Sequence, residues 1–261
     1  MESPSQNDPP RRSTKDLLLS IAARVVLAVI GPPLRAWDRK AALSASLYLT
    51  SSTVVADAIY DAYGLRAEVI PPPPALGPDG HELPLQGIKP GFFLCIARLL
   101  PYKNVDVIIE AMKALPSERL VVVGEGPQQA ALESIAGSNV RFVGSVDDAA
   151  LRWAYRNTQA VVSASFEDYG LTPLEAASFG KPVVVLRAGG FLDTVVERQT
   201  GLFFDEPKAD QIEKMLREVA QTIWEPSVII THVQKFSAEA FQSRIRQIMN
   251  EQLLLAEPSP T

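Results

Sequence analysis

Residues 160–177 read AVVSASFEDYGLTPLEAA, and this stretch decides the fold class. Its first five residues, 160–164, are small or β-branched and predict a buried strand. Gly170 frees the chain to turn, and Pro173 suits the start of a helix that we predict over 171–179. A buried strand that leads within a few residues into a helix is typical of a parallel sheet with helical connections.

The same alternation extends to both sides of this stretch. Further strands are predicted at 92–97, 120–123, 140–143, 182–186 and 201–204. Further helices are predicted at 105–115, 128–136, 147–157, 210–224 and 237–254. Apart from Arg141 and Ser163, the strand runs are apolar throughout, as expected for strands covered on both faces. We therefore expect an α/β fold with a Rossmann-like parallel sheet and helices on both faces.

Composition narrows the class of protein. Of 261 residues, 47% are hydrophobic and 21% are charged, which suits a globular protein with a sizeable core. The formal net charge of -5 argues against nonspecific nucleic-acid binding, so no nucleic-acid partner is expected. The single cysteine, Cys95, lies in an apolar run and predicts a buried strand residue. No Cys/His cluster has zinc spacing.

The first part of the chain, 1–33, is predicted to be a disordered leader followed by an apolar helix. Residues 1–15 are rich in Pro, Ser and charge. The apolar run 17–30 is shorter than the roughly 20 residues of a spanning helix, and Arg24 interrupts it. Two alternatives remain open: the helix packs on protein, or it lies on a membrane surface. We accordingly expect a cytoplasmic protein, with peripheral membrane contact through 17–30 as the alternative.

The segment 34–76 reads as helix, short strand and helix. Residues 37–44 are helical in pattern, 47–50 can be a strand, and Ser51 or Ser52 caps a helix that runs to about Tyr63. Four prolines at 71–74 exclude helix and central strand. Linker composition continues over 77–91, so we place a domain boundary there. The main domain is then 92–235, followed by a C-terminal helix and tail at 236–261.

Two segments that follow predicted strands carry candidate ligand groups, because ligands bind beyond the carboxyl ends of such strands. Residues 97–104 contain Arg98 and Lys103, whose cationic groups could hold a diphosphate. The alternative is a pair of solvated loop cations. Residues 123–127 contain Gly124, where the backbone could approach a ligand. They do not complete a GxGxxG loop, and an ordinary strand-to-helix turn is the alternative.

The third such segment is the opening stretch itself. Free N–H groups at the start of its helix attract anions, so a phosphate near Leu171 or Thr172 is physically reasonable. The Glu175 carboxylate could accept two hydrogen bonds from a sugar diol. Glu167 could contact a second polyol or stabilise positive charge at a sugar carbon. The alternative is that both glutamates only favour the helix N-terminus.

At this point the sequence resembles a known family, the retaining GT-B glycosyltransferases and especially their GT4-like group. Glu167 and Glu175 form its E-x7-E pattern, and EDYGLTPLEA is similar to its usual EGFGLPPLEA. ARLLPYKN at 97–104 resembles its GRLxPxKG. VVGEGP, FVGSV and AGGFLDTV resemble its later landmarks in the right order. Asp168, Tyr169 and Asp193 depart from the usual residues.

The resemblance implies a metal-independent transfer of a hexose from a nucleotide-diphosphate sugar to an unknown acceptor, with retention of configuration and no cofactor. Arg98 and Lys103 would bind the diphosphate, Glu167 the transferred sugar and Glu175 the ribose. The implied catalytic residues are Glu167, Arg98 and Lys103. The implied donor-binding residues are Glu175, Gly170, Leu171, Thr172, Val146 and Gly124.

The resemblance also implies that 34–76 is a short helical remnant of the acceptor-binding front domain. One hypothesis is therefore an enzyme completed by a separate front-domain polypeptide or by self-association. The other is a truncated, non-catalytic module that binds a nucleotide sugar or a partner protein. The apolar side of the last helix, including Phe241, Ile245 and Ile248, is expected to seek another surface.

Overall fold

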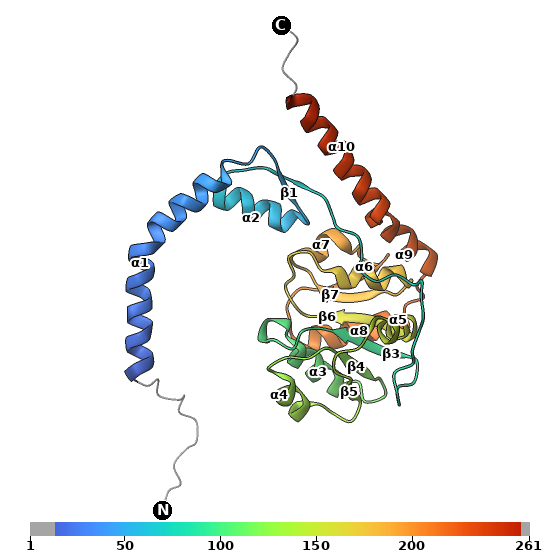
Figure 1. Ribbon diagram of the computed structural model, residues 1–261. Coiled ribbons are helices and arrows are strands. Elements are labelled where there is room, and N and C mark those ends of the chain that lie inside the picture. Colours follow the sequence, from blue (N-terminus) through green and yellow to red (C-terminus); the bar gives the residue numbers. More distant parts are fainter. Residues whose placement is uncertain (1–13, 257–261) are drawn as a thin grey trace, which may run out of the picture. The chain divides into compact units, whose positions relative to one another are not determined.

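The computed structural model describes residues 14–256 of the chain, and its centre is a six-stranded sheet (Figure 1). The strands are β3 (Phe92–Ile96), β4 (Leu120–Val123), β5 (Val140–Phe142), β6 (Thr158–Ser163), β7 (Val183–Leu186) and β8 (Gly201–Phe204). Their order is β5-β4-β3-β6-β7-β8, and every neighbouring pair is parallel. The α/β fold predicted from the sequence is confirmed, with strand ends that differ by no more than two residues.

Helices cover both faces of the sheet, because alternate residues of each strand point to opposite sides. Phe93 and Cys95 pack with α3 (Val105–Lys113), α4 (Gln129–Ile135) and α8 (Ala209–Gln221). Phe92 and Leu94 pack with α5 (Asp148–Asn157), α6 (Leu171–Ser178) and α7 (Phe191–Thr194). The apolar strands predicted from the sequence are buried for this reason.

The local signals at the helix ends act as the sequence predicts. The Asp147 side chain accepts a hydrogen bond from the Ala150 N–H and caps α5. Gly170 has a φ of 78° and precedes α6 directly. The short helix η1 (Pro101–Lys103) follows β3 and was not predicted; neither was α7. Both are single turns, too short to show a period in the sequence.

Among the described residues, 14–48 and 59–66 form one compact unit, and 49–58 and 67–256 form a second unit. Helix α1 (Thr14–Ala42) runs through Pro32 and Pro33, so the break predicted after residue 33 is wrong. A proline removes one helical hydrogen bond and crowds the preceding turn, which bends a helix without having to end it. The leader predicted at 1–15 lies mostly outside the described residues.

A short strand pair precedes the main domain. It consists of β1 (Tyr48–Thr50) and β2 (Ala67–Val69), with α2 (Thr53–Tyr63) between them. β2 was not predicted. The Val55 N–H donates to the Ser52 hydroxyl at 3.3 Å, which confirms Ser52 as the predicted cap of α2. Gly64 has a φ of 73° just past the helix end.

Residues 70–91, here called the strap, contain no helix or strand and lie against the main domain. Leu76 and Leu85 are buried in the core on the α5 side of the sheet. The Leu83 N–H donates to the Ala149 carbonyl at 3.1 Å, and Arg156 pairs with Glu82. The segment predicted as a linker therefore packs on the domain along much of its length.

The C-terminal part adds three helical elements after α8. These are α9 (Pro226–Val233), the short η2 (Gln234–Phe236) and α10 (Ala238–Ala256). Ile229 and Phe236 pack with Leu174 of α6. Arg244 of α10 pairs with Glu68 of β2. Within residues 14–256, no helix has the length and hydropathy that crossing a membrane requires.

Candidate functional site

The strand order of this sheet identifies one position at its carboxyl edge where a ligand is expected to bind. The chain begins at β3, builds β4 and β5 on one side, and then crosses to β6 on the other side of β3. The loops after β3 and β6 therefore leave the carboxyl edge in opposite directions, at the point where ligands bind in such sheets. The Asn104 side-chain amide donates to the Ala164 carbonyl at 2.8 Å and ties these two loops together.

The two loops bring Lys103 and Glu167 into direct contact. The Lys103 ammonium pairs with Oε1 of Glu167, and the Ser165 hydroxyl donates to the same oxygen at 2.5 Å. The Ser163 and Ser165 hydroxyl oxygens lie 3.0 Å apart. A cation from one loop and a carboxylate from the other are thus fixed next to each other at the edge of the sheet.

A cavity of about 350 Å³ opens beside this pair. Five residues predicted from the sequence line it: Lys103, Glu167, Gly170, Leu171 and Thr172. Gly170 permits the left-handed turn before α6, which is why the first N–H groups of the helix start at the cavity. Positive charge and helix N–H groups at one end suit an anion, while the carboxylate offers a hydrogen-bond acceptor.

Glu175 lies in a different environment and does not line that cavity. The Tyr155 hydroxyl donates to its Oε2 at 2.6 Å, and Tyr155 is fully buried. Burial raises the pKa of Glu175, and hydrogen bonds from Tyr155 and from the backbone N–H groups of Leu76 and Ala75 offset this only in part. The strap thus passes beside the carboxylate that was predicted to bind a diol.

The other predicted site residues are also outside the cavity lining. Arg98 is exposed, whereas its neighbour Leu99 is fully buried. A Cβ on Gly124 would lie 2.1 Å from the Ala97 carbonyl oxygen, so this glycine is required by the close packing of two loops. Val146 packs on the core at the α5 side of the sheet.

Residues from 49–76 that sequence reasoning missed complete the site. Ser51 and Pro72 line the cavity. The buried Ser52 hydroxyl donates to the Asp168 carbonyl at 2.5 Å, and the Tyr169 hydroxyl donates to the Pro72 carbonyl at 2.7 Å. The departure at 169 belongs to this contact region, and the Tyr169 hydroxyl, absent from the family's usual phenylalanine, was the available signal.

Asp193, another departure, holds the start of α2. Its two carboxylate oxygens accept from the Thr53 N–H at 2.7 Å and from the Thr53 hydroxyl at 2.6 Å. Because Asp is shorter than the more usual Glu, it fits a partner that lies close to its own backbone. The loop after β7 and the first turn of α2 are therefore joined.

Two glycines set the loop after β7 against the Glu167 loop. A Cβ on Gly189 would lie 2.2 Å from the Glu167 carbonyl oxygen, and a Cβ on Gly190 would lie 2.3 Å from Cα of Tyr169. The Gly190 N–H donates to the Glu167 carbonyl at 2.8 Å. Only residues without a Cβ allow this approach, which fixes the backbone on both sides of Glu167.

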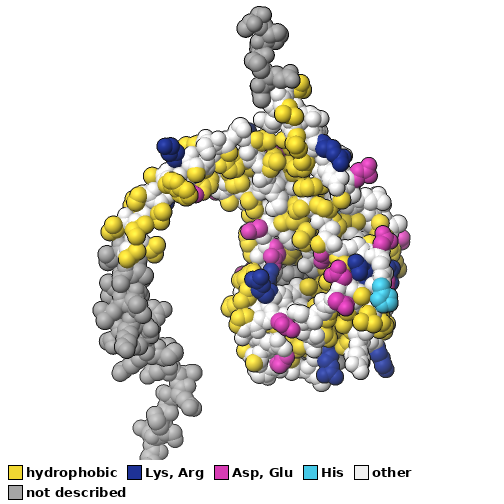
Figure 2. Space-filling model, in the orientation of Figure 1, with side chains coloured by type: hydrophobic (Ala, Val, Ile, Leu, Met, Phe, Trp, Pro, Cys, Tyr) yellow, Lys and Arg dark blue, Asp and Glu magenta, His cyan; other side chains and the backbone are white. Residues whose placement is uncertain are grey.

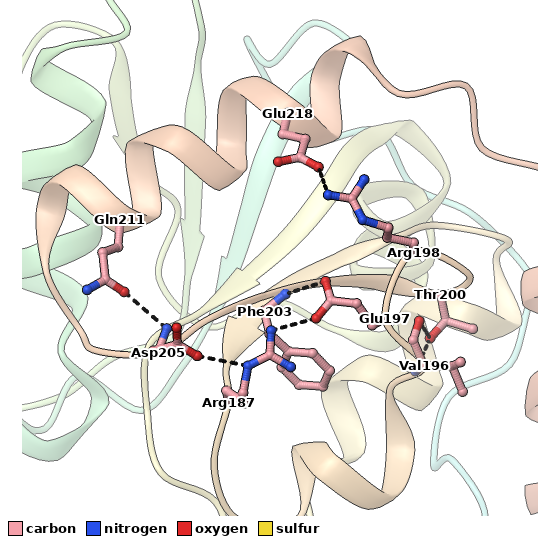
Figure 3. A network of polar contacts seen from close by, with 9 residues as sticks. All are labelled: Arg187, Val196, Glu197, Arg198, Thr200, Phe203, Asp205, Gln211 and Glu218. Atoms are coloured by element: carbon pink, nitrogen blue, oxygen red, sulfur yellow. Dashed lines mark hydrogen bonds and ion pairs between the residues drawn. The ribbon is translucent and has the colours of Figure 1, made fainter.

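The base of the loop after β7 is braced by a polar network (Figure 3). The Arg187 guanidinium donates to Glu197 at 2.6 Å and to Asp205 at 2.8 Å. These contacts, the Glu197 hydrogen bond first, raise the pKa of Arg187. Arg187 is thus bound to acidic partners, although it follows a strand at the carboxyl edge as Arg98 does. Within residues 14–256, no group of three or more His, Cys, Asp or Glu residues could hold a metal ion.

Several curated relatives match this part of the chain. It is 33% identical over 127 residues to sulfoquinovosyl transferase SQD2 of Arabidopsis thaliana, covering 47% of this chain and 25% of that protein. It is 34% identical over 127 residues to a glycogen synthase of Thermus thermophilus, covering 46% and 29%. It is 28% identical over 176 residues to a D-inositol 3-phosphate glycosyltransferase of Corynebacterium glutamicum, covering 60% and 42%. The matched part of the chain covers less than half the length of each of these relatives.

Solved structures share the fold at low identity. A lipopolysaccharide outer core galactosyltransferase, WaaB, superposes with a TM-score of 0.65 at 18% identity, over 80% of this chain and 62% of that one. Sucrose-phosphate synthase from Thermosynechococcus elongatus gives 0.67 at 22% identity, over 82% and 60%. Anabaena HepE, solved in complex with UDP and glucose, gives 0.63 at 19% identity, over 79% and 63%.

The family is settled by a sequence model that covers the strands, the loops and both glutamates of the candidate site. The model described as Glycosyl transferases group 1 matches residues 86–222, just over half of the chain. The resemblance stated from the motifs is thereby confirmed at the level of the family. The chain belongs to the glycosyl transferases group 1 family.

Proposed function

We propose that this chain binds a nucleotide-diphosphate sugar at the cavity beside Lys103 and Glu167 and transfers its hexose to an acceptor hydroxyl. The observation that carries the proposal is the contact between Lys103 and Glu167. In such a donor, only one oxygen separates the diphosphate from the anomeric carbon. A cation next to a carboxylate therefore fits the two sides of the bond that breaks.

In the proposed reaction, the acceptor oxygen bonds to the anomeric carbon as the bond from that carbon to the phosphate oxygen breaks. The electron pair leaves with the nucleoside diphosphate, and the acceptor proton passes to that phosphate oxygen. Lys103 and the N–H groups of Leu171 and Thr172 stabilise the leaving charge without a metal or cofactor. Glu167 contacts the sugar, and attack on the leaving-group face retains its configuration.

The remaining roles follow the family resemblance. Arg98 swings from its exposed position to the diphosphate, and Glu175 accepts hydrogen bonds from the ribose diol. Val146 and Gly124 lie toward the base. Because Glu175 already bonds to Tyr155 and lies beside the strap, we propose that the ribose enters between Glu175 and residues 75–76.

Calorimetric titration of the full chain with UDP, GDP and ADP tests donor binding. At least one of these nucleotides is expected to bind, and Lys103→Ala should weaken that binding tenfold or more, since it removes a charge-assisted contact. Glu175→Ala should also weaken it markedly. Lys113→Ala is the matched control, because Lys113 is an exposed lysine paired with Glu110 on α3. A folded chain that binds none of the three nucleotides contradicts the proposal.

The alternative function is a truncated, non-catalytic module that binds a nucleotide sugar or a partner protein, whereas the enzyme is completed by a front-domain polypeptide or by self-association. A module that binds a nucleotide sugar predicts the same nucleotide binding. It differs in predicting that the purified chain neither transfers nor hydrolyses the sugar of any donor. A mass-spectrometric assay with a panel of nucleotide sugars distinguishes the two, since robust turnover by the monomer excludes the alternative.

A further inference from the structure

The cavity beside Lys103 and Glu167, in which we propose that the donor binds, adjoins a second hollow in the same compact unit. Ser51 and Pro72 line both. The second hollow, here called the apolar groove, has a volume of about 250 Å³ and lies between the β1–β2 pair and α10. Besides the two shared residues, it is lined by Leu49, Thr50, Ile70, Phe241 and Ile245. A molecule that fills the groove can therefore extend past Ser51 toward Glu167.

The chemistry of the groove is that of a hydrocarbon site. No charged side chain belongs to its lining. Arg244, next to Ile245 in the sequence, is held by Glu68, its Nε donating to Oε1 at 2.6 Å. The Thr50 hydroxyl oxygen is covered and has no hydrogen-bond partner among the described residues, so it offers little polar surface. Such a surface favours alkyl groups and disfavours phosphates and sugars, which need hydrogen-bonding partners.

We propose that the apolar groove binds the hydrocarbon part of the acceptor, and that this acceptor is a lipid alcohol whose hydroxyl reaches the cavity at Glu167. This inference rests on the proposed function, because it assigns the acceptor of the same reaction. The acceptor oxygen has to meet the anomeric carbon beside Glu167, and the groove is the neighbouring space that shares two lining residues with that cavity.

Helix α1 independently favours a lipid acceptor. Leu27 and Val29 are 67% and 70% exposed, and Trp37 is 69% exposed. Hydrophobic side chains gather along the visible part of this helix (Figure 2). Arg39 and Lys40 stand in its last turn. An exposed apolar helix with a tryptophan and basic residues is suited to a membrane surface with anionic lipids, where lipid alcohols reside.

The test uses the full chain labelled with ¹³C in its isoleucine methyl groups, titrated with 1-octanol and 1-butanol. Ile70 and Ile245 report the groove, while Ile30, 47% exposed on α1, reports nonspecific apolar binding. We expect the Ile70 and Ile245 signals to shift and saturate. Each methylene should tighten binding up to about fourfold, so 1-octanol should bind at least tenfold more tightly than 1-butanol. Shifts confined to Ile30, or no shifts, overturn the proposal.

Two variants add a matched comparison. Ile245→Glu places a carboxylate in the groove and should reduce 1-octanol binding at least tenfold, as followed by the Ile70 signal. Met249→Glu adds the same charge one turn along α10, where Met249 is 58% exposed, and should leave that binding unchanged. Equal losses in both variants contradict the assignment.

A UDP and GDP titration of the same samples separates this proposal from the donor proposal. If a nucleotide binds but the Ile70 and Ile245 methyl signals do not shift with 1-octanol, the acceptor proposal is overturned and the donor proposal stands. If the groove methyls respond but no nucleotide binds, the donor proposal falls, and the groove stands only as a lipid-binding site.

Discussion

Glu167 and Glu175 stand eight residues apart on one strand-to-helix segment, yet they lie in opposite environments. Glu167 is on the loop before α6, pairs with Lys103 and lines the cavity of about 350 Å³ beside that pair. Glu175 is one turn into α6, outside that lining, and its partner is the buried hydroxyl of Tyr155. A cation faces the first carboxylate, whereas burial dominates the second and raises its pKa.

The two environments suit the two glutamate side chains to different roles. A carboxylate held in an ion pair with an ammonium suits a position next to positive charge that develops at a sugar carbon. A desolvated carboxylate gains more from each hydrogen bond that it accepts, which suits an uncharged diol. The two are also held differently: glycine packing fixes the Glu167 loop, whereas the Tyr155 hydroxyl and backbone N–H groups of the strap orient Glu175.

The largest effect is expected from a substitution that disrupts the glycine packing against the Glu167 loop. In Gly190→Ala, the added Cβ would meet backbone atoms of Tyr169 at 2.3 and 2.4 Å. Neither backbone can yield easily, so we expect a loss of about 3 kcal/mol in the free energy of unfolding, measured by urea denaturation. The folded variant should also bind nucleoside diphosphates more weakly, because Glu167 and Lys103 shift together.

Gly77→Ala is the control for this change. Gly190 has a φ of -67°, so alanine suits its backbone and only the clash is at issue. Gly77 has no heavy atom within 4 Å of the position of an added Cβ. Its substitution should change the free energy of unfolding by no more than about 0.5 kcal/mol. Similar losses at both positions would show that glycine packing does not hold the Glu167 loop.

A smaller effect is expected when the hydroxyl that orients Glu175 is removed. Tyr155→Phe keeps the ring, which stacks on Phe179 with centroids 5.3 Å apart, but leaves a buried carboxylate without its side-chain donor. We expect a loss of about 1–3 kcal/mol in the free energy of unfolding. The pKa of Glu175, followed by ¹³C NMR of its carboxyl carbon, should rise further.

Tyr102→Phe removes a hydroxyl from a tyrosine that is 54% exposed on η1. It should leave both the stability and the pKa of Glu175 unchanged. If Tyr155→Phe behaves like Tyr102→Phe, the Tyr155 hydroxyl does not orient the carboxylate, and the contrast between the two glutamates rests on burial alone.

The sequence predicts one side of this contrast better than the other. Lys103, Glu167 and Gly170 follow strands at the carboxyl edge, and the position of an edge follows from the order of strands and helices. Their meeting at one cavity agrees with the strand order, since β4 and β5 are added on one side of β3 and β6 is added on the other. The six strands were predictable for a related reason, since apolar runs bounded by glycine and proline are local signals.

The environment of Glu175 could not be predicted in the same way. It depends on Tyr155, which is 20 residues away, and on the strap around Leu76, which the sequence describes only as proline-rich and irregular. Long-range side-chain contacts leave no periodic pattern. The course of α1 through Pro32 and Pro33 was missed for another reason, because proline predicts a bend and an end equally well.

The smallest expected effect is a pH dependence of the free energy of unfolding that comes from Glu175 and not from Glu167. Burial raises the folded-state pKa of Glu175 above its ordinary value of 4.5, so the folded chain holds this proton more tightly than the unfolded chain. The stabilisation from this linkage is fully present below pH 4.5 and is lost as the pH rises through the folded-state pKa. Glu175→Gln, which needs no proton to be neutral, should therefore have a free energy of unfolding up to about 1 kcal/mol higher than that of the parent protein at pH 7 and little changed at pH 4, measured by denaturation at both values.

Glu167→Gln should show no such gain, because it breaks the pair with Lys103. A Glu175→Gln variant that is less stable than the parent at pH 7 would mean that hydrogen bonds outweigh burial there, and that the two glutamates are more alike than their surroundings indicate.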